Sequence, residues 1–159
     1  MIYRYFLEHE KKDIVELKKE VSERIAYRPH VRPFLKQLHA MGLNLAIVTN
    51  AHRGSINLKL EQTDLSAYFD EIICSHDFKA PKEEALFWES LYKARPFDLQ
   101  KTVFFDDNDS VLAAAKTFGM TQLFSIAQPD SKKAVRLQSD YPLVHSFLDL
   151  LPEELRQYD

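Results

Sequence analysis

Two neighbouring carboxylates directly follow a short apolar run in the second half of this sequence. Val103 to Phe105 are apolar, Asp106 and Asp107 come next, and Asp109 lies two residues further on. Carboxylates crowded at one point repel one another unless a cation lies among them, and carboxylate oxygens are good ligands for a metal cation. A helix cap would need only one such residue. The cluster therefore indicates a metal site rather than a cap alone.

Two other polar groups follow apolar runs in the same way. Thr49 and Asn50 end the run over 43–48, and Lys82 follows the run over 71–75. Each alone has an ordinary explanation, a helix cap for the threonine and a surface position for the lysine. Ligand sites in open α/β sheets lie beyond the carboxyl ends of the strands, so we expect these groups to share one crevice with Asp106. A hydroxyl, an ammonium and a bound cation together suit a phosphoryl group.

The elements that must position these groups alternate between helices and short apolar strands. Apolar runs predict four strands, and residues repeating with a helical period predict the helices between them. This alternation favours an α/β fold of the Rossmann type, with a parallel sheet, right-handed crossovers and helices on both faces. The strands are expected over 43–48, 71–75, 102–106 and 122–127, and the helices over 10–26, 31–41, 55–62, from Pro81 onward, 110–119 and 145–151.

Composition limits the classes of protein to consider. The chain has 159 residues, which suits one domain, and a net charge of −3 with no basic face argues against a nucleic-acid partner. Cys74 is the single cysteine and lies in an apolar run, so we expect a buried thiol, no internal disulfide and a reducing, cytoplasmic setting. No run is long enough for a membrane span, and Met1 to Arg4 do not resemble a signal peptide.

Three segments of the sequence carry a family resemblance, namely Leu45-Ala46-Ile47-Val48-Thr49-Asn50, Ala80-Pro81-Lys82 and Phe104-Phe105-Asp106-Asp107. In both order and spacing they resemble motifs two, three and four of haloacid dehalogenase-like (HAD) hydrolases. Shorter matches are similar to a purine 5′-nucleotidase branch that acts on GMP and IMP. These are Thr49-Asn50-Ala51-His52, Lys59-Leu60-Glu61, Ser75-His76 and Pro81-Lys82-Glu83.

The resemblance implies a role for each matched position. The Thr49 hydroxyl and the Asn50 backbone amide would bind a phosphate oxygen, Lys82 would neutralise the phosphate, and Asp106 and Asp107 would hold Mg²⁺. The expected catalytic residues are thus Lys82 and Thr49, and the expected partner is a small phosphomonoester, most specifically a purine nucleotide.

Four further polar residues near these motifs are weaker candidates. His52 and Arg53 follow the threonine and could contact the substrate, or they could be an exposed loop pair. His76 could be a structural histidine or a site residue. Asp109 is expected to cap the helix that follows it.

One family motif has no counterpart ahead of Thr49. The family's first motif is a strand followed by Asp-x-Asp-x-Thr, whose first aspartate attacks phosphorus, whereas residues before Pro29 form a charged amphipathic pattern. We interpret 1–27 as the remnant of a helical cap and 28–159 as the carboxyl-terminal part of the core, with the first strand and most of the cap missing. The resemblance therefore predicts a chain inactive by itself, with a gap between the strand ending at Thr49 and the strand ending at Asp106.

The predicted function is therefore a Mg²⁺-dependent phosphomonoester hydrolase of HAD type, most specifically a purine nucleoside 5′-monophosphatase. One alternative is a non-catalytic phosphate-binding remnant or regulatory module. Another is a different HAD phosphatase, acting on a sugar phosphate or phosphoglycolate, or a dehalogenase. The adjacent acids Asp106 and Asp107 favour a phosphatase over a dehalogenase, because paired carboxylates have no purpose beside an anionic haloacid.

Overall fold

The computed structural model describes residues 30–63, 65–129 and 134–156 of the chain. The helix expected over 10–26 and the cap remnant expected over 1–27 lie outside these residues. The described residues form short parallel strands with helices between them, so the predicted α/β fold is confirmed.

Among the described residues, five strands form two separate parallel sheets. In the first sheet, β1 (Ala46–Thr49) pairs with β2 (Glu71–Cys74), and Thr49 lies opposite Cys74. In the second, β3 (Val103–Asp106) pairs with β4 (Gln122–Ile126), which pairs in turn with β5 (Leu143–Val144). Four of the strands were predicted from their apolar runs. The fifth has only two residues, too few to show any alternation in the sequence.

Four α-helices in the described part of the chain connect and cover the strands. Glycines in the left-handed conformation follow two of them, Gly42 at φ 72° and Gly119 at φ 118°, and both close the helices that the sequence predicted to end there. None of the helices within the described ranges has the length and apolar character that crossing a bilayer requires. The helices are α3 (Val31–Ala40), α4 (Arg53–Thr63), α5 (Ala85–Ala94) and α6 (Asp109–Phe118).

Two predicted helices differ from those observed. Pro81 does not open α5, because residues 81–84 form a turn in which the Glu84 N–H donates to the Pro81 carbonyl, and the helix begins at Ala85. The turn leaves Lys82 in a loop. The helix expected over 145–151 is a single 3₁₀ turn over Phe147–Leu150, for which the Ser146 hydroxyl accepts a hydrogen bond from the Leu148 N–H.

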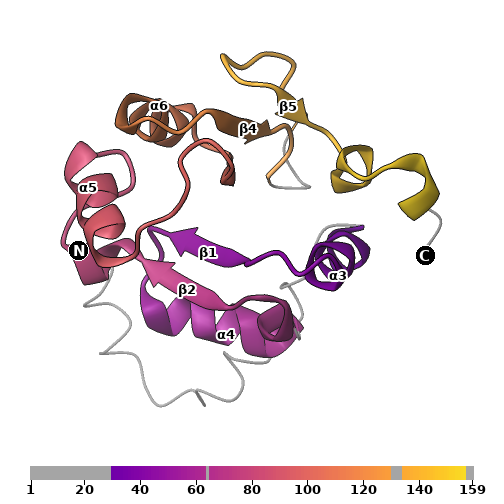
Figure 1. The fold of residues 1–159 in the computed structure, drawn as a ribbon, viewed down its shortest axis with the longest axis horizontal. Coiled ribbons are helices and arrows are strands. Elements are labelled where there is room, and N and C mark those ends of the chain that lie inside the picture. The colour runs from indigo at the N-terminus through magenta and orange to yellow at the C-terminus, as the bar shows by residue number, and fades with distance from the viewer. Residues whose placement is uncertain (1–29, 64, 130–133, 157–159) are drawn as a thin grey trace, which may run out of the picture.

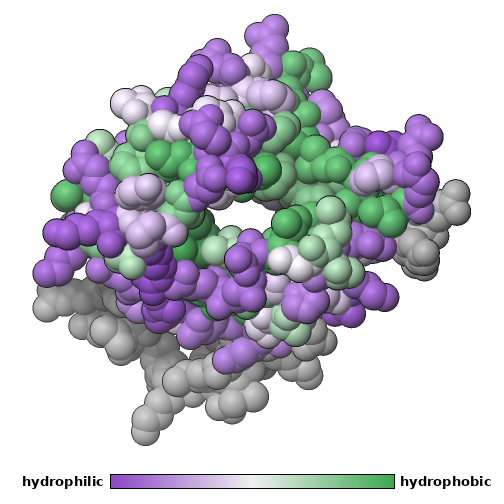
Figure 2. Space-filling model, viewed as in Figure 1, coloured by the Kyte–Doolittle hydropathy of each residue, from purple (hydrophilic) through white to green (hydrophobic). Residues whose placement is uncertain are grey.

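An opening separates the two sheets. Within the described residues β1 pairs with β2 alone and β3 pairs with β4, so β1 and β3 are not hydrogen-bonded neighbours. The ribbons part at this place in Figure 1, and Figure 2 shows an opening through the molecule there, with apolar side chains on part of its rim. The gap predicted between β1 and β3 is confirmed.

Strand β1 is less buried than its sequence predicted. The apolar run over 43–48 indicated a strand covered on both faces, yet Ala46 is exposed and Ile47 and Val48 are only half-buried. The prediction of a strand covered on both faces was therefore wrong; among the described residues β1 pairs only with β2, and its other side borders the opening. Leu43, just before β1, and Val103, at the start of β3, are 47% and 48% exposed.

The core lies where α5 and α6 pack on β3 and β4. Trp88 and Phe87 of α5 are buried edge to face against each other, and Trp88 packs in the same way on Phe104 of β3, with ring centroids 5.1 Å apart. Leu112 of α6 is completely buried in the same cluster. Cys74 is also completely buried and is a free thiol, as predicted.

Side chains from α3 reach across to the second sheet. The ring of Phe34 stacks on Phe147 at 5.1 Å and meets Phe105 of β3 edge to face at 6.4 Å. Since Phe34 is only 6% exposed, this aromatic contact links the segment that precedes β1 to β3. Helix α3, which precedes β1, is therefore packed against the second sheet although β1 and β3 do not pair.

Candidate functional site

Lys82 lies between the two sheets at the carboxyl ends of their strands. Its ammonium group donates to the Val48 carbonyl of β1 at 3.3 Å and to Oδ2 of Asp106 at the end of β3 at 2.5 Å. These bonds use two of its three donor positions. Lys82 is 8% exposed and Asp106 is 7% exposed, so the ion pair is buried. The structure thus brings together the lysine and the first aspartate that the sequence selected.

The loop before α5 holds the lysine in place. The Lys82 carbonyl accepts a 2.8 Å hydrogen bond from Nε1 of the buried Trp88, and the Lys82 N–H donates to Oδ1 of Asn50 at 3.0 Å. The lysine therefore enters the opening from a backbone that is tied to α5 on one side and to the end of β1 on the other.

Thr49 and Asn50 form the corresponding turn after β1. The Thr49 hydroxyl accepts a 3.0 Å bond from the Ala51 N–H, which leaves its own proton available to donate. Asn50 is fixed by its side chain, whose Oδ1 accepts from the Lys82 N–H. The turn can thus offer a hydroxyl donor beside the ammonium of Lys82, as a bound oxyanion requires.

The two adjacent aspartates lie in different environments. Oδ1 of buried Asp106 accepts from the Asn108 N–H at 3.0 Å, so both of its carboxylate oxygens have partners. Asp107 is exposed, and its backbone carbonyl accepts from the Arg136 guanidinium at 2.8 Å. The first aspartate is thus locked into the loop, whereas the second faces solvent.

A magnesium ion at the end of β3 would need ligands besides the two aspartates. The residues that the structure describes contain no group of three or more acidic, histidine or cysteine side chains able to hold a metal. Mg²⁺ is commonly held by one or two carboxylates, with water and phosphate oxygens completing its shell. Asp106 and Asp107 could supply those carboxylates.

His52 and Arg53, the substrate contacts expected after β1, interact with the loop that follows β2. The exposed rings of His52 and His76 meet edge to face with centroids 5.7 Å apart, and Arg53 forms an ion pair with Asp77. His52 is also bound locally, because its Nδ1 accepts from the Gly54 N–H. The structure therefore groups these residues with one another, beside the carboxyl ends of the first sheet.

Asp109 does not cap α6, contrary to the expectation from sequence. Asn108 is the cap, and its Oδ1 accepts from the Ser110 N–H at 3.0 Å. Asp109 instead accepts hydrogen bonds from Arg136 at 2.8 Å, Ser139 at 2.9 Å and Ser125 at 3.0 Å. The aspartate therefore fixes the segment after β4 to the start of α6.

These hydrogen bonds make the contribution of Asp109 to the stability of the fold depend on pH. Burial alone would raise its pKa, but the hydrogen bonds from Arg136, Ser139 and Ser125 outweigh burial and leave the pKa of Asp109 below its ordinary value. A carboxyl with a lowered pKa stabilises the fold above its unfolded pKa of about 4, and the contribution is lost as the pH falls through the folded value.

We expect Asp109→Asn to lower the free energy of unfolding by about 1 kcal/mol at pH 7, with the difference shrinking towards pH 3. Urea unfolding of the original chain and of Asp109→Asn, at pH 7 and at about pH 3, measures this difference in stability. Asp140→Asn, on the same exposed segment, is the control. A difference that is the same at both pH values would show that Asp109 is not stabilised as a carboxylate.

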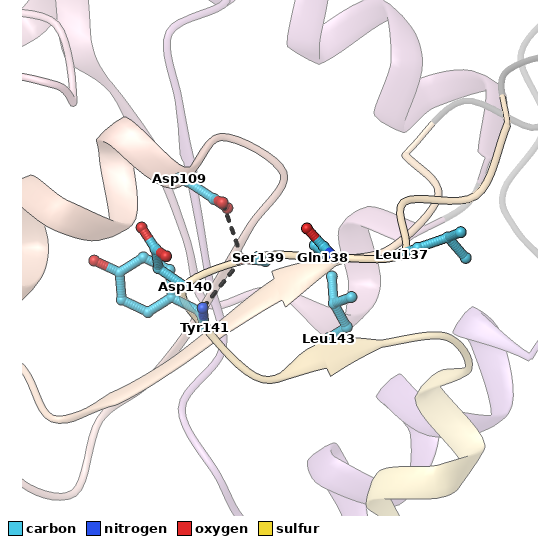
Figure 3. Close-up of a pocket in the computed structure, with 7 residues that line it drawn as sticks. All are labelled: Asp109, Leu137, Gln138, Ser139, Asp140, Tyr141 and Leu143. Carbon is cyan, nitrogen blue, oxygen red and sulfur yellow. Dashed lines mark hydrogen bonds between the residues drawn. The ribbon is translucent and has the colours of Figure 1, made fainter.

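An open hollow lies beside Asp109. Figure 3 shows it lined by that aspartate and by five consecutive residues over 137–141, together with Leu143, with the Ser139 hydroxyl between Asp109 and the Tyr141 N–H. Lys82, Asp106 and the other predicted site residues do not line it. The hollow is therefore separate from the candidate site.

A family comparison agrees with this arrangement. The family model described as haloacid dehalogenase-like hydrolase matches residues 1–124, most of the chain. The chain belongs to this family. This family of hydrolases includes phosphatases. HAD phosphatases generally use Mg²⁺ and hydrolyse small phosphate esters.

Curated relatives of this HAD chain include several phosphatases. It is 32% identical over 140 residues to the GMP/IMP nucleotidase YrfG of Escherichia coli K12, a match covering 88% of this chain and 63% of the relative. It is 31% identical over 127 residues to phosphoglycolate phosphatase of Salmonella paratyphi A, covering 78% and 49%. The chain thus spans less than two thirds of the length of these relatives.

Solved structures of HAD proteins share the fold. The HAD phosphatase of Thermococcus onnurineus is 25% identical with a TM-score of 0.69, covering 93% of this chain and 67% of that one. The HAD hydrolase YfnB of Bacillus subtilis, solved with magnesium bound, is 18% identical with a TM-score of 0.67, covering 84% and 58%. The second likeness concerns the fold alone.

Sequence reasoning missed two residues that organise the HAD site. Glu83 accepts hydrogen bonds from the side chains of Asn50 and Asn108, and Arg136 binds both Asp109 and the Asp107 carbonyl. Glu83 could have been noticed because it adjoins Lys82. Arg136 closely follows Lys132 and Lys133 in the sequence, a small basic group that is typical of solvated surface, so no pattern marks it as part of a site.

Proposed function

We propose that this chain carries the phosphate-binding half of a HAD phosphomonoesterase site. The observation that supports the proposal most directly is the position of the Lys82 ammonium, which contacts both the end of β1 and Asp106. Thr49 offers its hydroxyl proton beside it, and the exposed carboxylate of Asp107 lies one residue beyond Asp106. A phosphate placed among these groups meets a cation and a hydrogen-bond donor.

Each residue has a stated task in this proposal, and Asp106 has two. Lys82 neutralises charge on the phosphate, the Thr49 hydroxyl and the Asn50 N–H orient its oxygens, and Asp106 holds the lysine in position. Asp106 and Asp107 would hold Mg²⁺, which when bound supplies further charge neutralisation at the phosphate oxygens. His52 and Arg53 would contact the part of the substrate that projects past the β1 loop.

The finer proposal is a purine nucleoside 5′-monophosphate, GMP or IMP, as the substrate. It is supported by the similarity to the GMP/IMP nucleotidase and by the motif matches around Thr49 and Lys82. Phosphoglycolate or a phosphorylated carbohydrate is the second candidate, because relatives named as phosphatases of those compounds match at 31% and 28% identity.

Calorimetric titration of the 159-residue chain tests both levels of the proposal. With Mg²⁺ present, we expect GMP and IMP to bind, guanosine and inosine to bind at least about tenfold more weakly, and phosphoglycolate to bind more weakly than GMP. We also expect no phosphate release from any of them, since no Asp-x-Asp-x-Thr segment precedes Thr49.

The outcomes separate the two levels. Equal affinity for GMP and guanosine would contradict the phosphate site, whereas tighter binding of phosphoglycolate than of GMP would contradict only the purine assignment. Lys93→Ala, which removes an exposed ammonium from α5, is the matched control for Lys82→Ala and should bind GMP as the original chain does. Turnover that depends on Asp107 would contradict the expected inactivity.

A further inference from the structure

The carboxylate of Glu83 lies between two side-chain amides that belong to different sheets. Its Oε2 accepts a 2.8 Å hydrogen bond from Nδ2 of Asn50, which follows β1. Its Oε1 accepts a 3.2 Å bond from Nδ2 of Asn108, which lies two residues after the end of β3. One side chain thus bridges the carboxyl ends of two strands that do not pair with each other.

Both amides are held in one orientation by backbone donors. Oδ1 of Asn50 accepts from the Lys82 N–H at 3.0 Å, and Oδ1 of Asn108 accepts from the Ser110 N–H at 3.0 Å. Rotating either amide by half a turn would place its NH₂ group against an N–H donor. Each asparagine therefore presents NH₂ to Glu83, and the group between them must offer two acceptors. An ionised carboxylate does so, and a carboxamide does not.

Lys82, the neighbour of Glu83, makes a second link between the ends of β1 and β3. The Lys82 ammonium connects the Val48 carbonyl with Asp106 close to the bridge that Glu83 makes. Both links start from a loop that Trp88 ties to α5. The positions of Thr49 and Asp106 relative to each other thus depend on two adjacent side chains of one loop.

We propose that Glu83 is a positioning residue, which sets the width of the phosphate crevice by holding Asn50 and Asn108 at a fixed separation. The bridge itself follows from the geometry, whereas its effect on phosphate rests on the proposed function. Glu83 need not touch the ligand, because its two oxygens are already engaged by the amides.

Glu83→Gln separates this role from simple electrostatics. A negative charge near the site repels phosphate, so its removal alone would tighten phosphate binding. If Glu83 positions the site, binding must weaken instead, because the new NH₂ group faces the NH₂ of one asparagine and breaks that contact. Glu84→Gln, an exposed neighbour with the same change in charge, measures the electrostatic effect alone.

Asn108→Asp supplies a designed rescue. Alone, it places a carboxylate against the carboxylate of Glu83 and should open the bridge. Combined with Glu83→Gln, it restores an acceptor opposite the new NH₂ group, keeps the acceptor for the Ser110 N–H and returns the net charge to that of the original chain. Two changes that are each harmful should thus compensate when they are combined.

Titration with inorganic phosphate and thermal unfolding are measured for the two single variants, the double variant and the original chain. We expect each single variant to raise the phosphate Kd at least about fivefold and to lower the unfolding midpoint, and the double variant to return the Kd to within about twofold. Glu84→Gln should leave the Kd unchanged or lower it.

The outcomes distinguish the bridge from the proposed function. Additive effects in the double variant, or tighter phosphate binding by Glu83→Gln, would overturn the positioning role. If the original chain binds no phosphate, the proposed function fails, and the unfolding midpoints still test the bridge. In that case, midpoints that show no compensation in the double variant would overturn the bridge as well.

Discussion

Replacing Lys82 by methionine is expected to lower the free energy of unfolding by about 3 kcal/mol or more. The ammonium is the partner of the Asp106 carboxylate at 2.5 Å, and both side chains are largely shielded from water. Methionine keeps most of the length of the side chain beside the Phe104 ring but leaves a buried carboxylate without its counter-charge. Removing one member of a buried ion pair costs far more than breaking an exposed pair. Urea unfolding, followed by the fluorescence of the single tryptophan, Trp88, measures the change.

A second substitution distinguishes lost charge compensation from lost packing. Lys82→Met combined with Asp106→Asn removes the stranded charge while keeping the Oδ1 acceptor for the Asn108 N–H, so it should recover much of the lost stability. Lys101→Met removes an ammonium whose side chain is 86% exposed and should change the stability by less than about 0.5 kcal/mol. If the double variant is no more stable than Lys82→Met alone, the buried charge is not the cause.

Trp88→Ala is expected to cost about 3 to 5 kcal/mol, enough to abolish cooperative unfolding in a small domain. The indole is 1% exposed and packs against Phe87 and Phe104, so alanine would leave a cavity at the centre of the core. The substitution also removes the Nε1 donor to the Lys82 carbonyl and so frees the loop that carries the ammonium. Circular dichroism measures the transition, because the variant has no tryptophan.

Trp88→Phe isolates the effect of losing the Nε1 donor to the Lys82 carbonyl. Phenylalanine retains much of the ring packing but lacks the N–H donor, so this variant should fold and yet bind phosphate more weakly than the original chain. Leu86→Ala on the same helix changes a residue that is 55% exposed and should alter the stability by less than about 0.5 kcal/mol. Phosphate binding unchanged in Trp88→Phe would mean that the indole donor does not position Lys82.

Most elements could be predicted because their signals are local. The runs before Thr49 and Asp106 and the glycine after α6 identify strands and a helix end from a few consecutive residues. The start of α5 was misplaced because proline is compatible both with a first helical turn and with the turn that precedes it. The capping residue of α6 was misassigned because Asn108 and Asp109 are both good caps, and the choice depends on Arg136, which is distant in sequence.

The candidate site was predictable to the extent that it follows from strand direction. Parallel strands bring their carboxyl ends to one edge, which is enough to expect Thr49, Lys82 and Asp106 near one another. The bridge made by Glu83 could not be predicted, because it depends on the orientation of two amides set by backbone N–H groups in separate loops. The half-exposed side chains of β1 were likewise hidden, because an apolar run records the preference of a strand but not whether a neighbour covers it.

The separation of the two sheets determines which strands we expect to protect their amides from hydrogen exchange. Central strands normally hold the slowest-exchanging amides, because both of their edges are paired, and protection falls towards the outer strands. Among the described residues, β1 and β3 are each paired on one side only, while β4 is paired on both sides. We therefore expect the slowest-exchanging amides in β4, and faster exchange in β1 and β3, whose ends carry the site. Local opening there would move Thr49 relative to Asp106 without unfolding the aromatic core around Trp88.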